Sequence, residues 1–282
     1  MDIYILATHM QKPIVIDADS GVNILARLRE CWLRWDLVMM LSYRDVKVRY
    51  TQTAIGMLWA VINPLVSILL LFFVFNVVVK VDTEGIPPLL FTLSGLCAWN
   101  YFSKVVSEAG TSIVGAQALV KKIYFPRLVI PLSKAISGLV ELVVVLILLF
   151  IVLIYYHYKL DTQILLLLPC IILVFFVGLG CGIWVAALTI RFRDFHYIVP
   201  ILLRIGMFAS PIAYATKIVP QGYKWILSLN PLTGIIDGFR YAIFNIPLDY
   251  QIFMTSVGIS VGLLISGLIY FLRMEKYIAD IV

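Results

Sequence analysis

The chain has 282 residues, of which 62% are hydrophobic and 13% charged, whereas soluble domains average about 45–50% apolar and about 25% charged residues. This composition excludes an ordinary soluble globule. Several apolar runs of about 20 residues, each long enough to cross ~30 Å of hydrocarbon, predict an all-α polytopic membrane protein. The net charge of +6 does not indicate nucleic acid as a partner, because lysine and arginine flank the apolar runs and do not line one soluble face.

The first 50 residues are expected to stay outside the hydrocarbon. Residues 1–23 contain Asp2, Asp17 and Asp19 and lack the basic start and apolar core of a cleavable signal peptide, so we predict a retained cytosolic tail. Residues 24–50 combine apolar positions at three-to-four spacing with six basic residues, which predicts an amphipathic helix in the membrane interface. Its arginines would face anionic lipid or a cytosolic partner, and a simple lipid anchor is the alternative.

Six membrane-crossing helices are predicted from the apolar runs. Their approximate ranges are 54–79, 88–114, 135–156, 164–189, 196–215 and 251–271. This arrangement puts fifteen basic residues on one side of the membrane and five on the other, with Lys104 and Arg204 inside crossings. Because basic residues concentrate on the cytosolic side, both termini are predicted to be cytosolic. The chain has little left for a second folded domain, so residues 24–282 are expected to form one transmembrane domain.

The segment 217–246, between the fifth and sixth crossings, contains two apolar pieces that break at Asn230 and Pro231. Each piece has about ten residues, too few to span the bilayer. We therefore predict a re-entrant helical hairpin. Such a hairpin must be buried in protein or face a water-filled pathway, because irregular backbone is not tolerated in lipid. A pair of amphipathic helices on the outer surface is the alternative.

The sequence lacks the motifs of common catalytic and metal sites. It has no P-loop, and the run 178–182 (GLGCG) lies in an apolar helix, where small residues indicate close helix packing. The three histidines and four cysteines have no metal-ligand spacing, and no group of catalytic side chains is evident. We therefore expect a protein that is not an enzyme and that has no metal site or cofactor of its own.

Four charged residues fall inside the predicted crossings, where charge is costly and marks functional positions. Lys104 and Glu108 are four residues apart on the second crossing, while Glu141 lies on the third. Arg204 lies on the fifth. One interpretation is structural, with Lys104 paired to Glu108 and Glu141 paired to Arg204. The other is that these groups line a pore, in which case Glu108 or Glu141 would relay protons in an ion-coupled carrier.

Aromatic side chains in or beside the crossings are candidates for contact with a sugar polymer. Their ring faces stack on the C–H faces of sugars, so we expect a subset of them to line a channel. An interfacial aromatic belt is the alternative. The candidates are Trp59, Trp99, Tyr101, Phe102 and Tyr214.

The cytosolic stretch 118–127 has the composition of a short docking helix. It is basic and aromatic, and Pro126 ends it. Apolar groups such as Tyr124 and Phe125 favour a groove on a partner protein over open water. The residues expected to make this contact are Leu119, Lys121, Lys122, Tyr124, Phe125, Pro126 and Arg127.

Five segments resemble the membrane subunits of ABC-2 type polysaccharide exporters, the family that exports O-antigen, capsule and teichoic acid. The segments are residues 43–64 (YRDVKVRYTQTAIGMLWAVINP), 120–131 (VKKIYFPRLVIP), 191–194 (RFRD), 210–214 (SPIAY) and 229–231 (LNP). The resemblance extends over about residues 25–272. It is specific for the family and does not indicate which polymer is exported.

The resemblance implies a homodimer of six-helix subunits that encloses a channel in the bacterial inner membrane. Two copies of a separate ATPase subunit would bind ATP and Mg on the cytosolic side. The helix over 24–50 would lie beside the cytosolic entrance, 118–127 would be the coupling helix, and 217–246 would be a gate at the outer end.

The implied substrate is an undecaprenyl-pyrophosphate-linked polysaccharide. Arg44, Lys47 and Arg49, near the cytosolic entrance, would bind its pyrophosphate, because arginine forks match phosphate oxygens. Contact with anionic membrane lipids is the alternative for these residues. Two other functions fit the same sequence: an ABC-2 exporter of a drug or lipid, and a proton-coupled secondary transporter that needs no ATPase. A membrane-bound transferase fits less well, because no catalytic cluster of histidine or acidic residues is evident.

Overall fold

The computed structural model describes residues 24–51 and 55–281, and the regular elements in these ranges are all helical. The predicted tail 1–23 lies outside the described residues. The α-helices are α1 Ile24–Leu33, α2 Trp35–Tyr50, α3 Trp59–Phe72, α4 Pro88–Gly115, α5 Gln117–Lys122, α6 Val129–Tyr155, α7 Leu167–Arg191, α8 Phe195–Ala209, α9 Lys224–Leu229, α10 Pro231–Phe244 and α11 Tyr250–Ile281. Short 3-10 turns cover Gly56–Leu58, Thr162–Leu166, Thr216–Ile218 and Gln221–Tyr223, and a π-helical turn, Phe73–Val78, extends α3.

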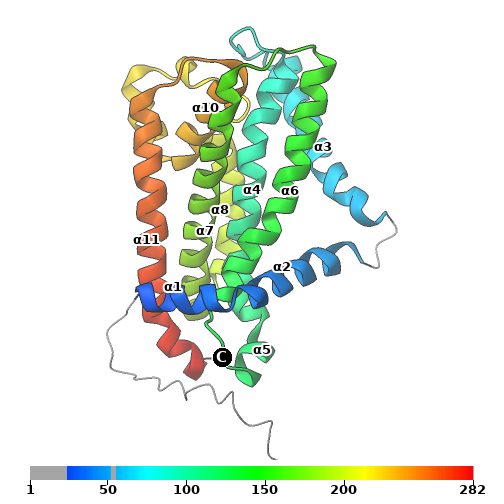
Figure 1. Ribbon diagram of the computed structural model, residues 1–282. Helices are drawn as coiled ribbons and strands as arrows, with labels where there is room; N and C mark the ends of the chain where they lie inside the picture. Colours follow the sequence, from blue (N-terminus) through cyan, green and yellow to red (C-terminus); the bar gives the residue numbers. More distant parts are fainter. Residues whose placement is uncertain (1–23, 52–54, 282) are drawn as a thin grey trace, which may run out of the picture.

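The long helices α4, α6, α7 and α11 stand roughly upright, while α1 and α2 lie across one end of them (Figure 1). The helical structure predicted for residues 24–50 is therefore present, but as two helices that meet at Arg34. Cys31, Val38 and Leu41 are buried against the bundle, whereas Trp32 and Trp35 are exposed. The exposed surface carries basic side chains together with apolar ones such as Met40 and Val48, a mixture that suits contact with both lipid headgroups and hydrocarbon.

Four of the six predicted crossings are long and apolar enough to span a bilayer within the described residues. They are Trp59–Val78, Val129–Tyr155, Thr162–Arg191 and Tyr250–Glu275. α4 has 28 residues and is long enough to span the bilayer, but its composition is more polar than that of a typical membrane-spanning helix. α8 has 15 residues, or about 22 Å of helix, which is shorter than the hydrocarbon. The fifth crossing was predicted to be helical over 196–215, but the structure ends that helix at Ala209.

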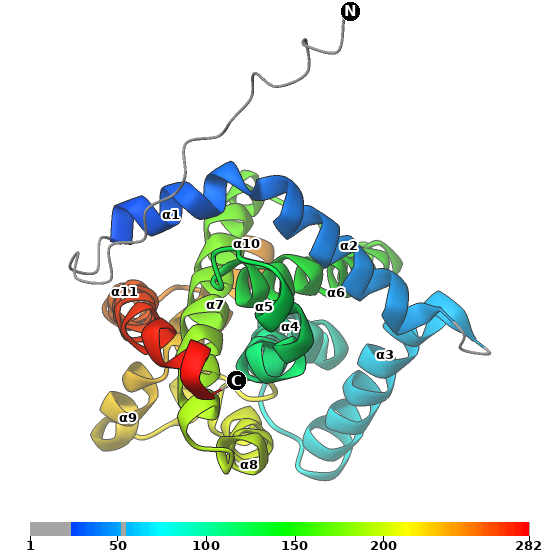
Figure 2. The same cartoon turned by 90° about the horizontal axis from the view of Figure 1, so that it is seen from below.

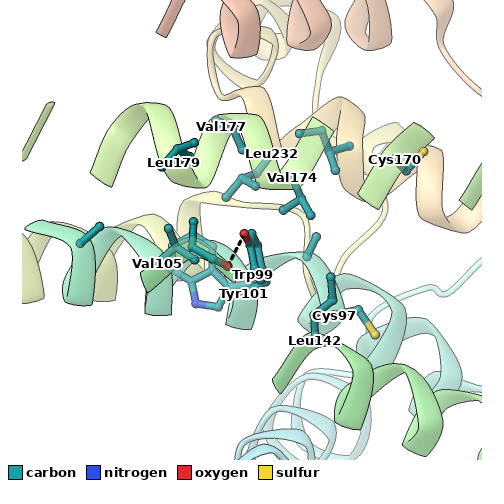
Figure 3. Close-up of a cluster of buried hydrophobic side chains, with 14 of the residues drawn as sticks. Cys97, Trp99, Tyr101, Val105, Leu142, Cys170, Val174, Val177, Leu179 and Leu232 are labelled. Atoms are coloured by element: carbon teal, nitrogen blue, oxygen red, sulfur yellow. Dashed lines mark hydrogen bonds between the residues drawn. The ribbon is translucent and has the colours of Figure 1, made fainter. Parts of the chain in front are cut away.

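The core lies along α7, which packs against α4 on one side and α11 on the other, while α6 packs against α4. Figure 3 shows apolar side chains of α4 and α7 meeting in this core. The glycine run on α7 packs closely, as predicted: a Cβ added to Gly180 would lie 2.7 Å from the backbone nitrogen of Leu264 on α11. One turn further along α7, the Trp184 indole stacks on Tyr270 and donates a hydrogen bond to Ser266 over 3.0 Å. Small residues thus bring two membrane helices into backbone contact.

The helix α3 stands apart from this core. Over the most apolar stretch of the span that contains α3, 17% of the residues are buried, against 39% over the corresponding stretch of the span that contains α7. Its lower end diverges from α6, whereas its upper end approaches α4 (Figure 1). Pro64 lies inside the helix, as predicted. One broad apolar face of α3 is therefore left without a partner in the subunit.

The segment between α8 and α11 is irregular up to α9 and largely exposed over residues 217–229, whereas α10, which follows, is a regular and mostly buried helix. α9 ends at Leu229, and the side chain of Asn230 then caps α10 by accepting a hydrogen bond from the backbone N–H of Leu232 over 3.1 Å. Pro231 occupies the first position of α10, where its missing N–H costs nothing. The break predicted at Asn230 and Pro231 is confirmed. α10 itself packs against α4, α7 and α11 at the end of the bundle opposite α1 and α2 (Figure 1).

Candidate functional sites at the two ends of the bundle

A network of ion pairs connects α2 to α4 and α6 at the lower end of the bundle. The Arg49 guanidinium on α2 contacts Glu141 on α6 at 2.7 Å and also contacts Glu108 on α4. Lys104 on α4 contacts the same Glu141 oxygen. Each of these four side chains is at least two-thirds buried, so they balance two positive charges against two negative ones in a poorly solvated place.

The predicted pairing of these charges was wrong. Lys104 is paired with Glu141 on the neighbouring helix and not with Glu108 on its own helix. Glu141 is paired with α2 and α4, while Arg204 is exposed on α8. The pairing could not be predicted because it depends on Arg49. This residue precedes the first predicted crossing in the sequence, but in the structure it contacts both α4 and α6.

Of the three basic residues expected at the cytosolic entrance, Arg49 is engaged by carboxylates. Burial by itself lowers the pKa of the Arg49 guanidinium, but the adjacent Glu108 and Glu141 carboxylates outweigh it and raise that pKa. Arg44 contacts Asp45 at 2.9 Å, and both it and Lys47 are exposed on α2. An open cavity of about 630 Å³ between α2, α4, α5 and α6 has Arg44, Arg49 and Lys134 in its wall. Arg44 and Lys47 are thus accessible to a phosphate, whereas the guanidinium of Arg49 is already occupied by Glu108 and Glu141.

The predicted docking segment is helical from Gln117 to Lys122 and extended after it. Lys121, Lys122 and Tyr124 are exposed, and Leu119 packs partly against the core. Phe125, by contrast, is 7% exposed, and Pro126 beside it is also buried. The prediction that Phe125 enters a groove of a partner is therefore corrected, because its ring already fills a place in the subunit's own core.

Two neighbours hold the end of this docking segment in place. The Arg127 guanidinium donates to the backbone carbonyl of Glu275 at the lower end of α11, and the Arg127 backbone N–H donates to the Glu275 side chain over 3.4 Å. Arg27 on α1 forms a hydrogen bond with Tyr124 and an ion pair with Glu30 at 3.0 Å. Segments far apart in the sequence thus fix the chain that follows α5.

Cys31 lies on α1 beside this group of charges and is 4% exposed. Burial, followed by the carboxylates of Glu275 and Glu30, raises the pKa of its thiol to about 12. The thiolate is the reactive form and is populated only as the pH approaches this value, so Cys31 should react with a maleimide at least about tenfold more slowly at neutral pH than in the detergent-unfolded chain. Mass spectrometry of a variant that retains only this cysteine would measure the rate, and fast labelling of the folded protein would contradict the burial.

The aromatic residues expected in a channel are not all on the surface of the subunit. Tyr101 has no exposed surface, and its hydroxyl donates to the carbonyl of Ala135 over 3.0 Å. Trp99 is 5% exposed, and Figure 3 places both side chains in the core. Trp59 is 40% exposed, while Phe102 and Tyr214 are half-buried. The prediction that Trp99 and Tyr101 line a channel is therefore wrong for this structure, because both side chains are buried and pack inside the bundle.

At the opposite end of the bundle, the fully buried Arg240 of α10 organises the irregular backbone after α8. Its guanidinium donates to the carbonyl of Ile212 over 2.8 Å and to that of Tyr214 over 3.4 Å, and it lies 3.6 Å from the ring centre of Phe91. Asp237, one turn earlier, is 3.6 Å from Arg240. These contacts satisfy carbonyl groups that have lost their helical partners.

Two side-chain hydrogen bonds complete the attachment of this segment to α10. The Thr216 hydroxyl donates to Asp237 over 2.9 Å, and the Asn230 amide donates to the Ser210 hydroxyl over 2.8 Å. Arg240 is one of the five basic residues that the sequence pattern places on the outer side of the membrane, and its structural role was not predicted. A single arginine within an otherwise apolar stretch beside Asp237 was the available signal.

Within the described residues, the fold is that of an α-helical membrane protein with two helices lying across one end of the bundle, the short exposed helix α5 at that end and the largely buried helix α10 at the other. The chain belongs to the ABC-2 type transporter family, because the sequence model of that family matches residues 36–244. The resemblance seen in the five sequence segments is thereby confirmed.

Within this family, the chain is similar to several named polysaccharide permeases. The chain is 27% identical to the O-antigen export system permease protein RfbA of Klebsiella pneumoniae over 253 residues, which cover 88% of this chain and 95% of the relative. It is 27% identical to RfbA of Myxococcus xanthus over 241 residues, 84% of this chain and 92% of the relative. It is 25% identical to the polysialic acid transport protein KpsM of Escherichia coli over 240 residues, 80% of this chain and 90% of the relative. These proteins are similar to the chain over almost their full length.

Proposed function

We propose that this chain is the permease subunit of an ATP-driven exporter that moves a lipid-linked polysaccharide from the cytosol across the bacterial inner membrane. The observation that carries the proposal is membership of the ABC-2 type transporter family together with similarity to permeases named for O-antigen and polysialic acid. The polymer is O-antigen-like and is linked to undecaprenyl pyrophosphate. Arg44 and Lys47, exposed on α2, bind the pyrophosphate as it approaches the cytosolic entrance.

The active form in this proposal is a homodimer whose interface encloses the channel. Val199 alone is buried among the residues of α8, and α3 also has a broad exposed face. Both helices lie at the periphery of the bundle, on the edge opposite α1 (Figure 2). Arg204 is exposed on α8, and a charged side chain facing lipid is costly, which favours a second subunit or water next to this helix. A dimer through α3 and α8 meets that requirement.

The membrane topology in this proposal has six crossings and both termini in the cytosol. α4 crosses as a polar helix surrounded by α3, α6, α7 and α10, so little of it faces lipid. α8 and the irregular segment after it complete the fifth crossing. α9 and α10 form the re-entrant outer gate, and the contacts of Arg240 support this because they satisfy irregular backbone at membrane depth.

Energy comes from a separate ATPase subunit, two copies of which bind ATP and Mg on the cytosolic side. The exposed α5 is the docking element, and it presents Lys121 and Lys122 with Tyr124 just beyond them. Closure of the ATPase on ATP displaces α5 and shifts the membrane helices between closed and conducting states. This chain contributes no nucleotide-binding motif and needs no cofactor of its own.

The proposal is tested by reconstituting the chain with the ATPase encoded beside it in proteoliposomes, with and without lipid-linked glycan. We expect glycan to stimulate ATP hydrolysis and to appear on the far side of the membrane only when ATP is present. Hydrolysis stimulated by a drug or an ordinary phospholipid instead would identify a different ABC-2 exporter. Export driven by a proton gradient without an associated ATPase would indicate a secondary carrier and overturn the proposal.

Docking through α5 makes a separate prediction. The triple change Lys121→Glu, Lys122→Glu and Tyr124→Ala should abolish co-purification of the ATPase while the subunit stays folded, because all three side chains are exposed and the change removes only one surface hydrogen bond, that of Tyr124 with Arg27. A matched control, Lys80→Glu with Lys159→Glu at the opposite end of the bundle, should leave co-purification unchanged. Normal ATPase binding by the triple variant would show that α5 is not the docking element.

A further inference from the structure

Three polar contacts join α2 to α6 along one face of each helix. The Ser42 hydroxyl donates to the carbonyl of Ser133 over 3.0 Å, and Lys134 contacts Asp45 at 2.7 Å. Arg49 contacts Glu141 at 2.7 Å. On α2 these residues are three and four apart, which places them on one helical face. The interface helix is therefore attached to α6 at three successive turns.

Arg49 also attaches α2 to α4. It contacts Glu108 on α4, and Lys104 on α4 contacts the Glu141 carboxylate that Arg49 already holds. The Arg49 guanidinium thus joins α2 to both α4 and α6, and the Glu141 carboxylate on α6 contacts both α2 and α4. The fork of donors on arginine suits this shared position, whereas a lysine ammonium lacks the planar geometry.

The two helices that hold α2 are also the two helices that carry α5. In the chain, α4 leads directly into α5, and α5 leads through a short connection into α6. Seen from below, α5 lies beside α4 and next to the arc that α1 and α2 form (Figure 2). A displacement of α5 therefore passes directly into α4 and α6, and the ion pairs connect these helices to α2. A second connection, the hydrogen bond between Tyr124 just after α5 and Arg27, leads to α1.

We propose that α2, α4, α5 and α6 move as one unit and that Arg49, with Glu108 and Glu141, is the positioning residue that transmits displacement of α5 to the interface helix. This inference rests on the proposed function and adds the connection between the docking element and the cytosolic entrance. α2 carries Arg44 and Lys47, so the connection links ATPase closure to the position of the residues that meet the substrate. Partly buried pairs suit this role, because breaking one leaves an uncompensated charge and resists separation of the helices.

The first test compares Arg49→Gln with Arg29→Gln in the reconstituted complex. Arg29 is exposed on α1 and lies outside this network, so its variant should behave as the unmodified complex does. Arg49→Gln should lower the amount of glycan exported per ATP hydrolysed by about fivefold or more, the range of a typical coupling free energy, while hydrolysis continues. A proportional loss of export and hydrolysis, or no loss of either, would overturn the proposal.

A reversible cross-link gives a sharper test. In a chain whose native cysteines are replaced by alanine and which retains export, Asp45→Cys with Lys134→Cys removes one ion pair between α2 and α6. We expect the uncross-linked variant to export less glycan per ATP, and a bifunctional thiosulfonate that joins the two thiols to restore the ratio until reductant removes it. If the cross-link stops export, α2 must separate from α6 during transport, and the proposal is wrong.

A third measurement does not depend on the substrate. Spin labels at Met40→Cys on α2 and Ile147→Cys on α6, both exposed positions, report the distance between the helices. The distance should be single and unchanged by nucleotide in the otherwise unmodified complex, and it should broaden in Arg49→Gln but not in Arg29→Gln. If glycan export fails while this pattern holds, the proposed substrate is wrong and the mechanical unit stands. Equal distributions in the two variants would refute the unit itself.

Discussion

Replacing Arg240 by methionine should destabilise the subunit by about 3–5 kcal/mol, a large part of the 5–15 kcal/mol that holds a typical domain together. The change removes the donors that satisfy the carbonyls of Ile212 and Tyr214 and leaves the Asp237 carboxylate buried without its cation. Methionine fills a similar volume, so the loss measures unsatisfied polar groups and not a cavity. Thermal unfolding in detergent, followed by gel filtration, would show the effect.

Two further variants identify the cause of that loss. Arg273→Met, an exposed arginine at the lower end of α11, should leave the unfolding temperature unchanged. Adding Asp237→Asn to Arg240→Met should recover part of the stability, because it removes the uncompensated charge while keeping a hydrogen-bond acceptor for Thr216. An unfolding temperature for Arg240→Met equal to that of the unmodified chain would mean that the guanidinium does not hold this segment.

Gly180→Ala should be the most damaging small substitution in the core, with an expected cost of about 1–3 kcal/mol. The added Cβ would lie 2.7 Å from the nitrogen and 2.9 Å from the Cα of Leu264, both backbone atoms of α11 that cannot rotate away. α7 and α11 would have to separate, which also disturbs the stacking of Trp184 on Tyr270. The unfolding temperature in detergent and the fluorescence of Trp184 would report the change.

The matched control is Gly262→Ala on α11, where a Cβ would meet nothing within 4 Å. In an unobstructed helix, alanine is favoured over glycine by about 1 kcal/mol, so this variant should be as stable as the unmodified chain or more so. Equal behaviour of the two variants would show that backbone contact between α7 and α11 does not limit stability.

Sequence pattern alone located the helices that are apolar on most sides. α6 and α7 begin and end within about six residues of the predicted limits, because a long apolar run has one stable solution in a bilayer. α11 begins at Tyr250, one residue before its predicted start, but continues to Ile281, ten residues beyond its predicted end. The break at Asn230 and Pro231 was also predicted correctly, since a capping residue followed by proline is a local sequence signal for the start of a helix. The end of α8 at Ala209 was not, because the contacts that stabilise the unwound segment come from α10.

Contacts between residues that are far apart in the chain could not be predicted from the sequence pattern. Phe125 is a core residue and Tyr124 beside it is exposed, although both are aromatic residues in a basic segment. Lys104 and Glu108 have the spacing of an ion pair on one helix, but the better partners lie on α6 and α2. Local spacing gives the groups that are able to pair, while the fold decides which of them meet.

The pairing of α4 with α6 also constrains the order in which the protein is assembled during synthesis. A lysine or aspartate at the centre of an inserting helix costs about 2.5–3.5 kcal/mol, so if α4 crosses the bilayer as proposed, its Lys104 and Glu108 would make insertion of this helix by itself unfavourable. Glu141, which neutralises Lys104, is synthesised only with α6. In the proposed six-crossing topology, a nascent chain that ends after α5 would hold the Lys104 ammonium group without its acceptor on α6, and stable insertion of α4 would wait for the synthesis of α6.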